Sequence, residues 1–160
     1  MSPKILIVDD HEVVRHGVRS ILARSRPQWE ICGEASDGKH AIESVLLADP
    51  DVIILDITMP GMSGLEAAAE ISKLGLRCRI LIFTMHESER LVSDLRAVGA
   101  HGYVQKSQAS RDLVAAVETL LGGGTFFGPT LQSEPSKKKE PGSGPSLGRV
   151  FSSFVSLCPV

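Results

Sequence analysis

Short apolar runs alternate with segments of helical periodicity along residues 4–121. Apolar runs rich in β-branched residues occupy positions 4–8, 52–55, 79–83 and 102–105, and an alternating segment occupies positions 29–35. Each is followed by apolar residues spaced three and four apart, as in Val14, Val18, Ile21 and Leu22, which would share one face of a helix. The pattern predicts five strands and five helices in strict alternation.

Strands that are apolar almost throughout and separated by helices predict a parallel sheet with helices on both faces. In open sheets of this kind, ligands bind beyond the carboxyl ends of the strands. The polar residues that end the predicted strands are therefore the first candidates for a functional site. They are Asp9 and Asp10 after the first strand, Asp56 after the third, Thr84 after the fourth and Lys106 after the fifth.

Composition narrows the class of protein without naming a function. The chain carries 17 basic and 19 acidic side chains, which argues against a protein that coats nucleic acid. Its apolar runs are shorter than the ~20 residues of a membrane span, and residues 1–20 lack the core of a signal peptide. Because Cys32, Cys78 and Cys158 are widely spaced, we expect reduced thiols and a cytoplasmic location.

The composition changes sharply near the C-terminus. Residues 129–160 include 5 Pro, 3 Gly and 7 Ser, a mixture that cannot bury enough apolar surface to offset chain entropy. We therefore expect one domain over residues 1–124 and a disordered, Pro/Gly/Ser-rich tail over residues 125–160. The cluster Lys137–Lys139 would attract phosphates only weakly, so we expect neither direct DNA binding nor membrane binding from this tail.

The candidate residues together suggest a specific chemistry. Three carboxylates within a few ångströms repel one another unless a cation lies between them. Oxygen ligands of this kind favour Mg²⁺, which often combines one or two carboxylates with phosphate oxygens. A lysine and a threonine at the same edge would complete a site for a phosphoryl group. A carboxylate nucleophile beside Mg²⁺ is the apparatus that forms an aspartyl phosphate.

Four stretches carry a family resemblance. They are Ile-Leu-Ile-Val-Asp-Asp-His over 5–11, Ile-Ile-Leu-Asp-Ile-Thr-Met-Pro-Gly-Met-Ser-Gly over 53–64, Thr-Met-His over 84–86 and Gly-Ala-His-Gly-Tyr-Val-Gln-Lys over 99–106. In these stretches the chain resembles the receiver domains of bacterial two-component response regulators, in particular the NarL/FixJ subgroup. The resemblance covers residues 4–121 and implies the flavodoxin-like, CheY-like (βα)5 fold, with strand order 2-1-3-4-5.

The resemblance also implies roles for the acidic residues. Asp56 would be the phosphoacceptor and would receive its phosphoryl group from a sensor histidine kinase. Asp9, Asp10 and Asp56 would hold Mg²⁺, with the backbone carbonyl of Thr58 as a further ligand.

For the remaining residues the resemblance implies a switch. Lys106 would pair with the phosphoryl oxygens, Thr84 would turn toward them, and Tyr103 would follow inward. The fourth helix, fifth strand and fifth helix would then present a changed face to a downstream protein or to a second copy of the chain. Met85 is large for its position, and we expect it to narrow access to the phosphoryl group and slow its hydrolysis.

Two alternatives remain open at this stage. The first is a truncated NarL/FixJ-type transcription regulator whose DNA-binding helix-turn-helix domain is missing. The second is a Mg²⁺-dependent phosphohydrolase, which is disfavoured because Thr58 stands where such an enzyme needs a second carboxylate, two residues after the nucleophile. We expect slow self-hydrolysis of an aspartyl phosphate and no turnover of a free substrate.

Overall fold

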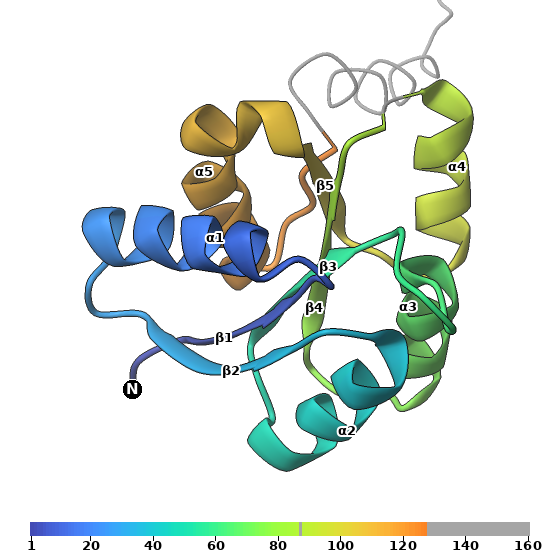
Figure 1. Cartoon of the computed structure of the whole chain (residues 1–160), viewed down its shortest axis with the longest axis horizontal. Coiled ribbons are helices and arrows are strands. Elements are labelled where there is room, and N and C mark those ends of the chain that lie inside the picture. Colours follow the sequence, from blue (N-terminus) through green and yellow to red (C-terminus); the bar gives the residue numbers. More distant parts are fainter. Residues whose placement is uncertain (87, 128–160) are drawn as a thin grey trace, which may run out of the picture. The chain divides into compact units, whose positions relative to one another are not determined.

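The computed structural model describes residues 1–86 and 88–127 (Figure 1). Strands and helices alternate as the sequence predicts, with one additional 3₁₀ helix, η1, that begins at the candidate lysine. In chain order the elements are β1 (Lys4–Val8), α1 (Glu12–Ser25), β2 (Glu30–Ala35), α2 (Gly38–Ala48), β3 (Val52–Asp56), α3 (Gly64–Lys73), β4 (Arg79–Thr84), α4 (Glu89–Ala97), β5 (Gly102–Gln105), η1 (Lys106–Gln108) and α5 (Ala109–Leu121). None of the described helices has the length and hydrophobicity needed to cross a bilayer.

The five strands form one parallel sheet in the order β2-β1-β3-β4-β5, which confirms the fold class and the strand order. From β1 the chain moves outward to β2 and then crosses to β3 on the other side of β1. The order of the strands therefore reverses between β1 and β3, and the carboxyl ends of these two strands form the edge where open α/β sheets bind ligands.

Helices cover both faces of the sheet (Figure 1). On one face, α1 and α5 pack side by side, and strand residues such as Ile5, Ile7 and Ile54 meet Leu113 and Val117 in a common core. On the other face, α2, α3 and α4 follow one another along the sheet, and α2 contacts α3. Because successive side chains point to opposite faces, a sheet covered on both sides needs strands that are apolar at every position.

Polar residues begin three of the helices. Ser63 and Glu66 form a reciprocal capping box at the start of α3. The Asp37 carboxylate accepts a hydrogen bond from the backbone N–H of His40 at the start of α2, at 2.8 Å. The hydroxyl of Ser88 accepts one from the backbone N–H of Leu91 in α4. Each cap satisfies a backbone donor that would otherwise lack a partner.

The start of α3 lies directly against the end of β3 because residue 64 is glycine. The backbone N–H of Gly64 donates to the carbonyl of Ile57 at 2.8 Å, and a Cβ at position 64 would lie only 1.9 Å from the carbonyl oxygen of Asp56. The preceding turn passes through Gly61, whose φ of 76° suits glycine. Together these glycines fold the loop 57–63 back over the carboxyl end of β3.

The folded unit continues past the predicted boundary at residue 124. Phe126 and Phe127 are buried, and Phe126 forms a parallel bridge with Gly102 at the outer edge of β5. The guanidinium of Arg96 in α4 lies 4.1 Å from the ring centroid of Phe127. Phe126 and Phe127 therefore belong to the folded unit, where they cover the edge of β5. The prediction placed them in the tail because the segment that follows them is rich in Pro, Gly and Ser. The remainder of the predicted tail, residues 128–160, lies outside the described residues.

Candidate functional site

Two buried carboxylates meet at the edge between β1 and β3. The register of these strands pairs Val8 with Leu55, so that Asp9, directly after β1, and Asp56, the last residue of β3, lie side by side. Asp9 is 1% exposed and Asp56 is 3% exposed. Buried carboxylates that lie side by side repel each other and therefore need a nearby positive charge.

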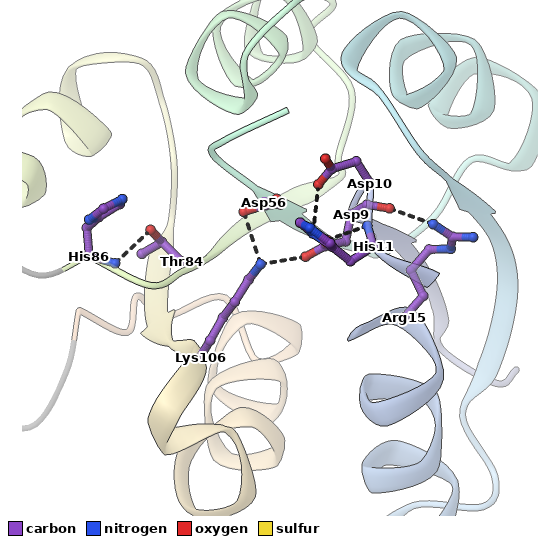
Figure 2. A network of polar contacts seen from close by, with 8 residues as sticks. All are labelled: Asp9, Asp10, His11, Arg15, Asp56, Thr84, His86 and Lys106. Atoms are coloured by element: carbon purple, nitrogen blue, oxygen red, sulfur yellow. Dashed lines mark hydrogen bonds and ion pairs between the residues drawn. The ribbon is translucent and has the colours of Figure 1, made fainter. Parts of the chain in front are cut away.

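Lys106, which directly follows the edge strand β5, supplies one positive charge. It begins η1, directly after β5, and its ammonium group reaches back to Oδ2 of Asp9 at 2.8 Å and to Oδ1 of Asp56 at 3.3 Å (Figure 2). The lysine side chain is 13% exposed, so water screens these ion pairs only weakly. The sequence placed this residue at the correct edge, and the structure shows that it bridges both carboxylates.

The pKa values reflect this environment. Burial, and then the neighbouring Asp9 carboxylate, raise the pKa of Asp56, while Lys106 and a hydrogen bond to the backbone of Thr58 offset part of the rise. Burial acts to lower the pKa of Lys106, but its contacts with Asp9 and Asp56 outweigh burial and the pKa is raised. Its contacts with Asp9 and Asp56 thus favour the charged form of Lys106, whereas burial disfavours the charged form of Asp56.

Asp10 adds a third carboxylate beside the first two. Its side chain is 26% exposed, and its Oδ1 lies 3.1 Å from Nδ1 of His11. Oδ2 of Asp9 and Oδ1 of Asp10 are buried atoms, and their close contacts are the ammonium group of Lys106 and the imidazole of His11. Ligand atoms of Asp9, Asp10 and His11 lie within 4.8 Å of one another. Carboxylate oxygens gathered in this way are the ligands that a hard divalent cation prefers.

His11 directly follows the acidic pair and is a neighbour of this cluster. Its backbone N–H donates to Oδ1 of Asp9 at 2.9 Å, and its imidazole is 68% exposed. Hard divalent cations prefer oxygen to an imidazole nitrogen. We therefore assign His11 to holding the Asp9 carboxylate in place.

The switch candidates lie farther along the same edge. Thr84 ends β4, is 1% exposed, and accepts a hydrogen bond at its hydroxyl from the backbone N–H of His86 at 3.1 Å (Figure 2). Tyr103 is buried in β5, opposite Ile82 of β4. Met85 is 70% exposed directly after Thr84. The structure thus places Thr84 at the carboxyl end of β4, Met85 directly after it, and Tyr103 in the strand that leads to Lys106.

Two residues at the site were missed by sequence reasoning. Arg15 in α1 donates from Nη1 to the backbone carbonyl of Asp9 at 2.7 Å and from Nε to Oε1 of Glu34 in β2 at 2.8 Å. The sequence offered only a weak sign of this contact. Arg15 lies in the first turns of the helix that follows the acidic pair, and Glu34 lies in the alternating segment 29–35. Only the fold shows that they meet.

Comparisons with known proteins match this chain to one family. The family model for the response regulator receiver domain matches residues 5–118. The chain is 35% identical over 128 residues to the transcriptional regulatory protein DegU of Brevibacillus brevis, covering 80% of this chain and 54% of that protein. It is 37% identical over 119 residues to the nitrate/nitrite response regulator protein NarL of Escherichia coli K12, covering 74% and 55%.

A solved structure matches nearly the whole described fold. The crystal structure of a two-component response regulator of the LuxR family from Aurantimonas sp. SI85-9A1 superposes with a TM-score of 0.78 at 35% identity, and the match covers 87% of this chain and 99% of that chain. The present chain spans about half the length of the curated relatives DegU and NarL.

Proposed function

This chain belongs to the family of response regulator receiver domains, and we propose that it accepts a phosphoryl group on Asp56 from a sensor histidine kinase. The observation that carries the proposal is the meeting of Asp9, Asp56 and Lys106 at the carboxyl ends of β1, β3 and β5. This arrangement provides a carboxylate nucleophile, a fixed cation and an acidic pair for a metal ion at one point.

Asp56 acts as the nucleophile in this proposal. One of its carboxylate oxygens attacks the phosphorus of a phosphohistidine, the new O–P bond forms, and the P–N bond breaks with its electron pair returning to the imidazole nitrogen. Transfer of this kind needs little covalent assistance beyond positioning and charge stabilisation. The buried position of Asp56 at the end of a rigid strand meets the requirement for positioning.

Charge stabilisation comes from two sources. Asp9, Asp10, Asp56 and the backbone carbonyl of Thr58 would hold Mg²⁺, which would supply positive charge to the phosphoryl oxygens. Lys106 already lies 3.3 Å from Asp56, so its ammonium group would exchange a carboxylate oxygen for a phosphoryl oxygen with little movement. Such an exchange would release part of the mutual attraction between Lys106 and Asp9.

The response to phosphorylation would begin at Thr84. Its hydroxyl accepts a hydrogen bond from His86, which leaves its own proton available for a phosphoryl oxygen. Because only the phosphorylated form offers this acceptor, phosphorylation biases the position of Thr84 and, through the adjacent strand, that of Tyr103. The face formed by α4, β5 and α5 would carry the change to a downstream protein or a second copy of the chain.

The proposal treats the chain as a switch that is loaded once per cycle. Thr58 follows Asp56 by two residues, where a phosphohydrolase would need a carboxylic acid for its general acid–base step. A truncated DNA-binding regulator is not better supported as an alternative. DegU and NarL are named as regulators, but the matched segment makes up only about half of each.

The direct test is to incubate the full chain with Mg²⁺ and a small acyl phosphate donor and to measure its intact mass. The parent should gain one phosphoryl group, and Asp56→Asn should gain none while keeping its fold by circular dichroism. Asp94→Asn, at an exposed position of α4, is the matched control and should label like the parent. Labelling of Asp56→Asn at the parent's level would show that the acceptor is another residue.

A further inference from the structure

We propose that Arg15 is a positioning residue for the metal site and that, with Glu34, it sets the affinity of the acidic pair for Mg²⁺. The inference rests on the proposed function, because it concerns the same site. Arg15 is six residues beyond Asp9 in the chain and is not expected to touch the metal or the phosphoryl group. Its effect would pass through the backbone between the two acidic residues.

The backbone of Asp9 is held from both sides. Its N–H donates to the carbonyl of Ala35 in β2 at 3.1 Å, and its carbonyl accepts from Nη1 of Arg15 at 2.7 Å. This carbonyl belongs to the peptide group that joins Asp9 to Asp10. Because a peptide group is rigid and planar, fixing its oxygen also fixes the direction in which the chain leaves toward Asp10. Arg15 therefore controls where the Asp10 carboxylate stands relative to that of Asp9.

Arg15 is itself prepared for this task. Its side chain is 17% exposed, and Nε donates to Oε1 of Glu34 at 2.8 Å (Figure 2 shows the contact with Asp9). A guanidinium group is planar and donates in several fixed directions, so one Arg15 side chain can hold Glu34 and the Asp9 carbonyl at once. A lysine at this position would offer a single point charge. The other oxygen of Glu34, Oε2, is paired with Arg19.

Arg19 provides a natural control. It contacts the same glutamate from the next turn of α1, but its side chain is 48% exposed, and its ion pair is with Glu34. If the pair formed with Glu34 merely stabilised the fold, loss of either arginine would have similar consequences. If Arg15 positions the acidic pair, only its loss should change Mg²⁺ binding.

The direction of the effect separates positioning from simple electrostatics. Arg15 is a cation close to the acidic pair, so deleting its charge alone would strengthen the binding of Mg²⁺. Loss of positioning predicts the reverse. Partners that orient metal ligands typically change affinity by about 10- to 100-fold when they are removed. We expect Arg15→Met to raise the dissociation constant for Mg²⁺ by about tenfold, the lower end of that range, because loss of the cation acts in the opposite direction.

The experiment is a calorimetric titration of the full chain with Mg²⁺, for the parent, Arg15→Met and Arg19→Met, together with urea unfolding in the absence of Mg²⁺. We expect both variants to lose stability, but only Arg15→Met to bind Mg²⁺ more weakly. If Arg15→Met fails to fold, Arg15→Gln is the second variant. Its amide can still donate to Glu34, but it is too short to donate to the Asp9 carbonyl at the same time. It should show the same loss of affinity for Mg²⁺.

Three outcomes would overturn the inference. In the first two, the folded Arg15 variant binds Mg²⁺ as tightly as the parent, or more tightly. In the third, Arg19→Met weakens Mg²⁺ binding as much as the Arg15 variant does. If the parent itself neither binds Mg²⁺ nor accepts a phosphoryl group from an acyl phosphate, the proposed function fails and this inference fails with it. A parent that does both, beside an unaffected Arg15→Met, refutes the inference alone.

Discussion

Replacing Lys106 with methionine should destabilise the fold strongly in the absence of divalent cations. The substitution preserves an unbranched apolar stem and removes the ammonium group that lies 2.8 Å from Asp9 and 3.3 Å from Asp56. Both carboxylates are almost completely buried, so water cannot replace the lost cation. The variant is left with two uncompensated negative charges in the interior of the protein.

The size of the effect follows from these distances. At an effective dielectric constant of about 20, unit charges separated by about 3 Å attract by roughly 5 kcal/mol, which applies to each of the two pairs. Desolvation of the buried ammonium group cancels several kcal/mol of this attraction, and breaking a buried ion pair typically costs about 3–5 kcal/mol. With a urea m-value of about 2 kcal/mol per molar, that loss moves the unfolding midpoint down by roughly 2 M.

The pH dependence gives the prediction a second signature. Burial and then Asp9 already raise the pKa of Asp56, and loss of the lysine should raise it further. Because the pKa of this carboxyl is higher in the folded state than in the unfolded state, protonation favours folding. The deficit of the variant should therefore be smallest below the unfolded pKa of about 3.9 and should grow as the pH rises through the folded pKa.

The assay is urea unfolding of parent and variant in a chelator, followed by the same measurement with Mg²⁺. The control is Lys73→Met, which removes an ion pair with Glu70 in which the two side chains are 71% and 51% exposed. That control should lose at most about 1 kcal/mol. Mg²⁺ should restore Lys106→Met more than it stabilises the parent. A loss no larger than that of Lys73→Met, or no response to Mg²⁺, would show that the ammonium group does not compensate these carboxylates.

Three further predictions concern His101, Gly64 and Met85. Burial, and then Arg79, lower the pKa of His101 in the folded state. The neutral imidazole should therefore contribute stability above the unfolded pKa near 6.5, and this stability should be lost as the pH falls through the folded pKa. In urea unfolding across a pH series, His101→Gln should remove this dependence of the midpoint on pH. Gly64→Ala should cost about 1–3 kcal/mol or more, because the new Cβ meets backbone, whereas Gly17→Ala, with open space around it, should not destabilise α1 in the same urea assay. Met85→Ala should shorten the lifetime of the phosphoryl group on Asp56, measured by its decay after removal of the donor, and equal lifetimes would remove Met85 as a barrier to water.

The agreement between sequence and structure is best where one local signal decides the outcome. Ser63 and Glu66 have the three-residue spacing of a capping box, and they form one. The strands end close to the polar residues that interrupt their apolar runs, since a charged side chain cannot continue into a core covered on both faces. The edge location of Asp9, Asp56 and Lys106 follows from the same rule.

The prediction was less complete where the outcome depends on packing between distant segments. The boundary expected at residue 124 came from composition, but Phe126 and Phe127 pack against β5 and α4. Two aromatic residues beside a glycine run give no period from which a strand can be recognised. Their burial becomes evident only once β5 is known to be the edge strand that they cover.

The order of apolar and polar residues by itself determined the alternation of strands and helices and brought the strand-ending carboxylates to one edge, because side-chain period and burial are properties of short segments. The tertiary structure alone decided that Arg15 holds the carbonyl of Asp9 while Glu34 holds Arg15. A hydrogen bond to a backbone carbonyl leaves no trace in the identity of the residue that accepts it. Such contacts exist only once α1 and β2 have been placed against the end of β1.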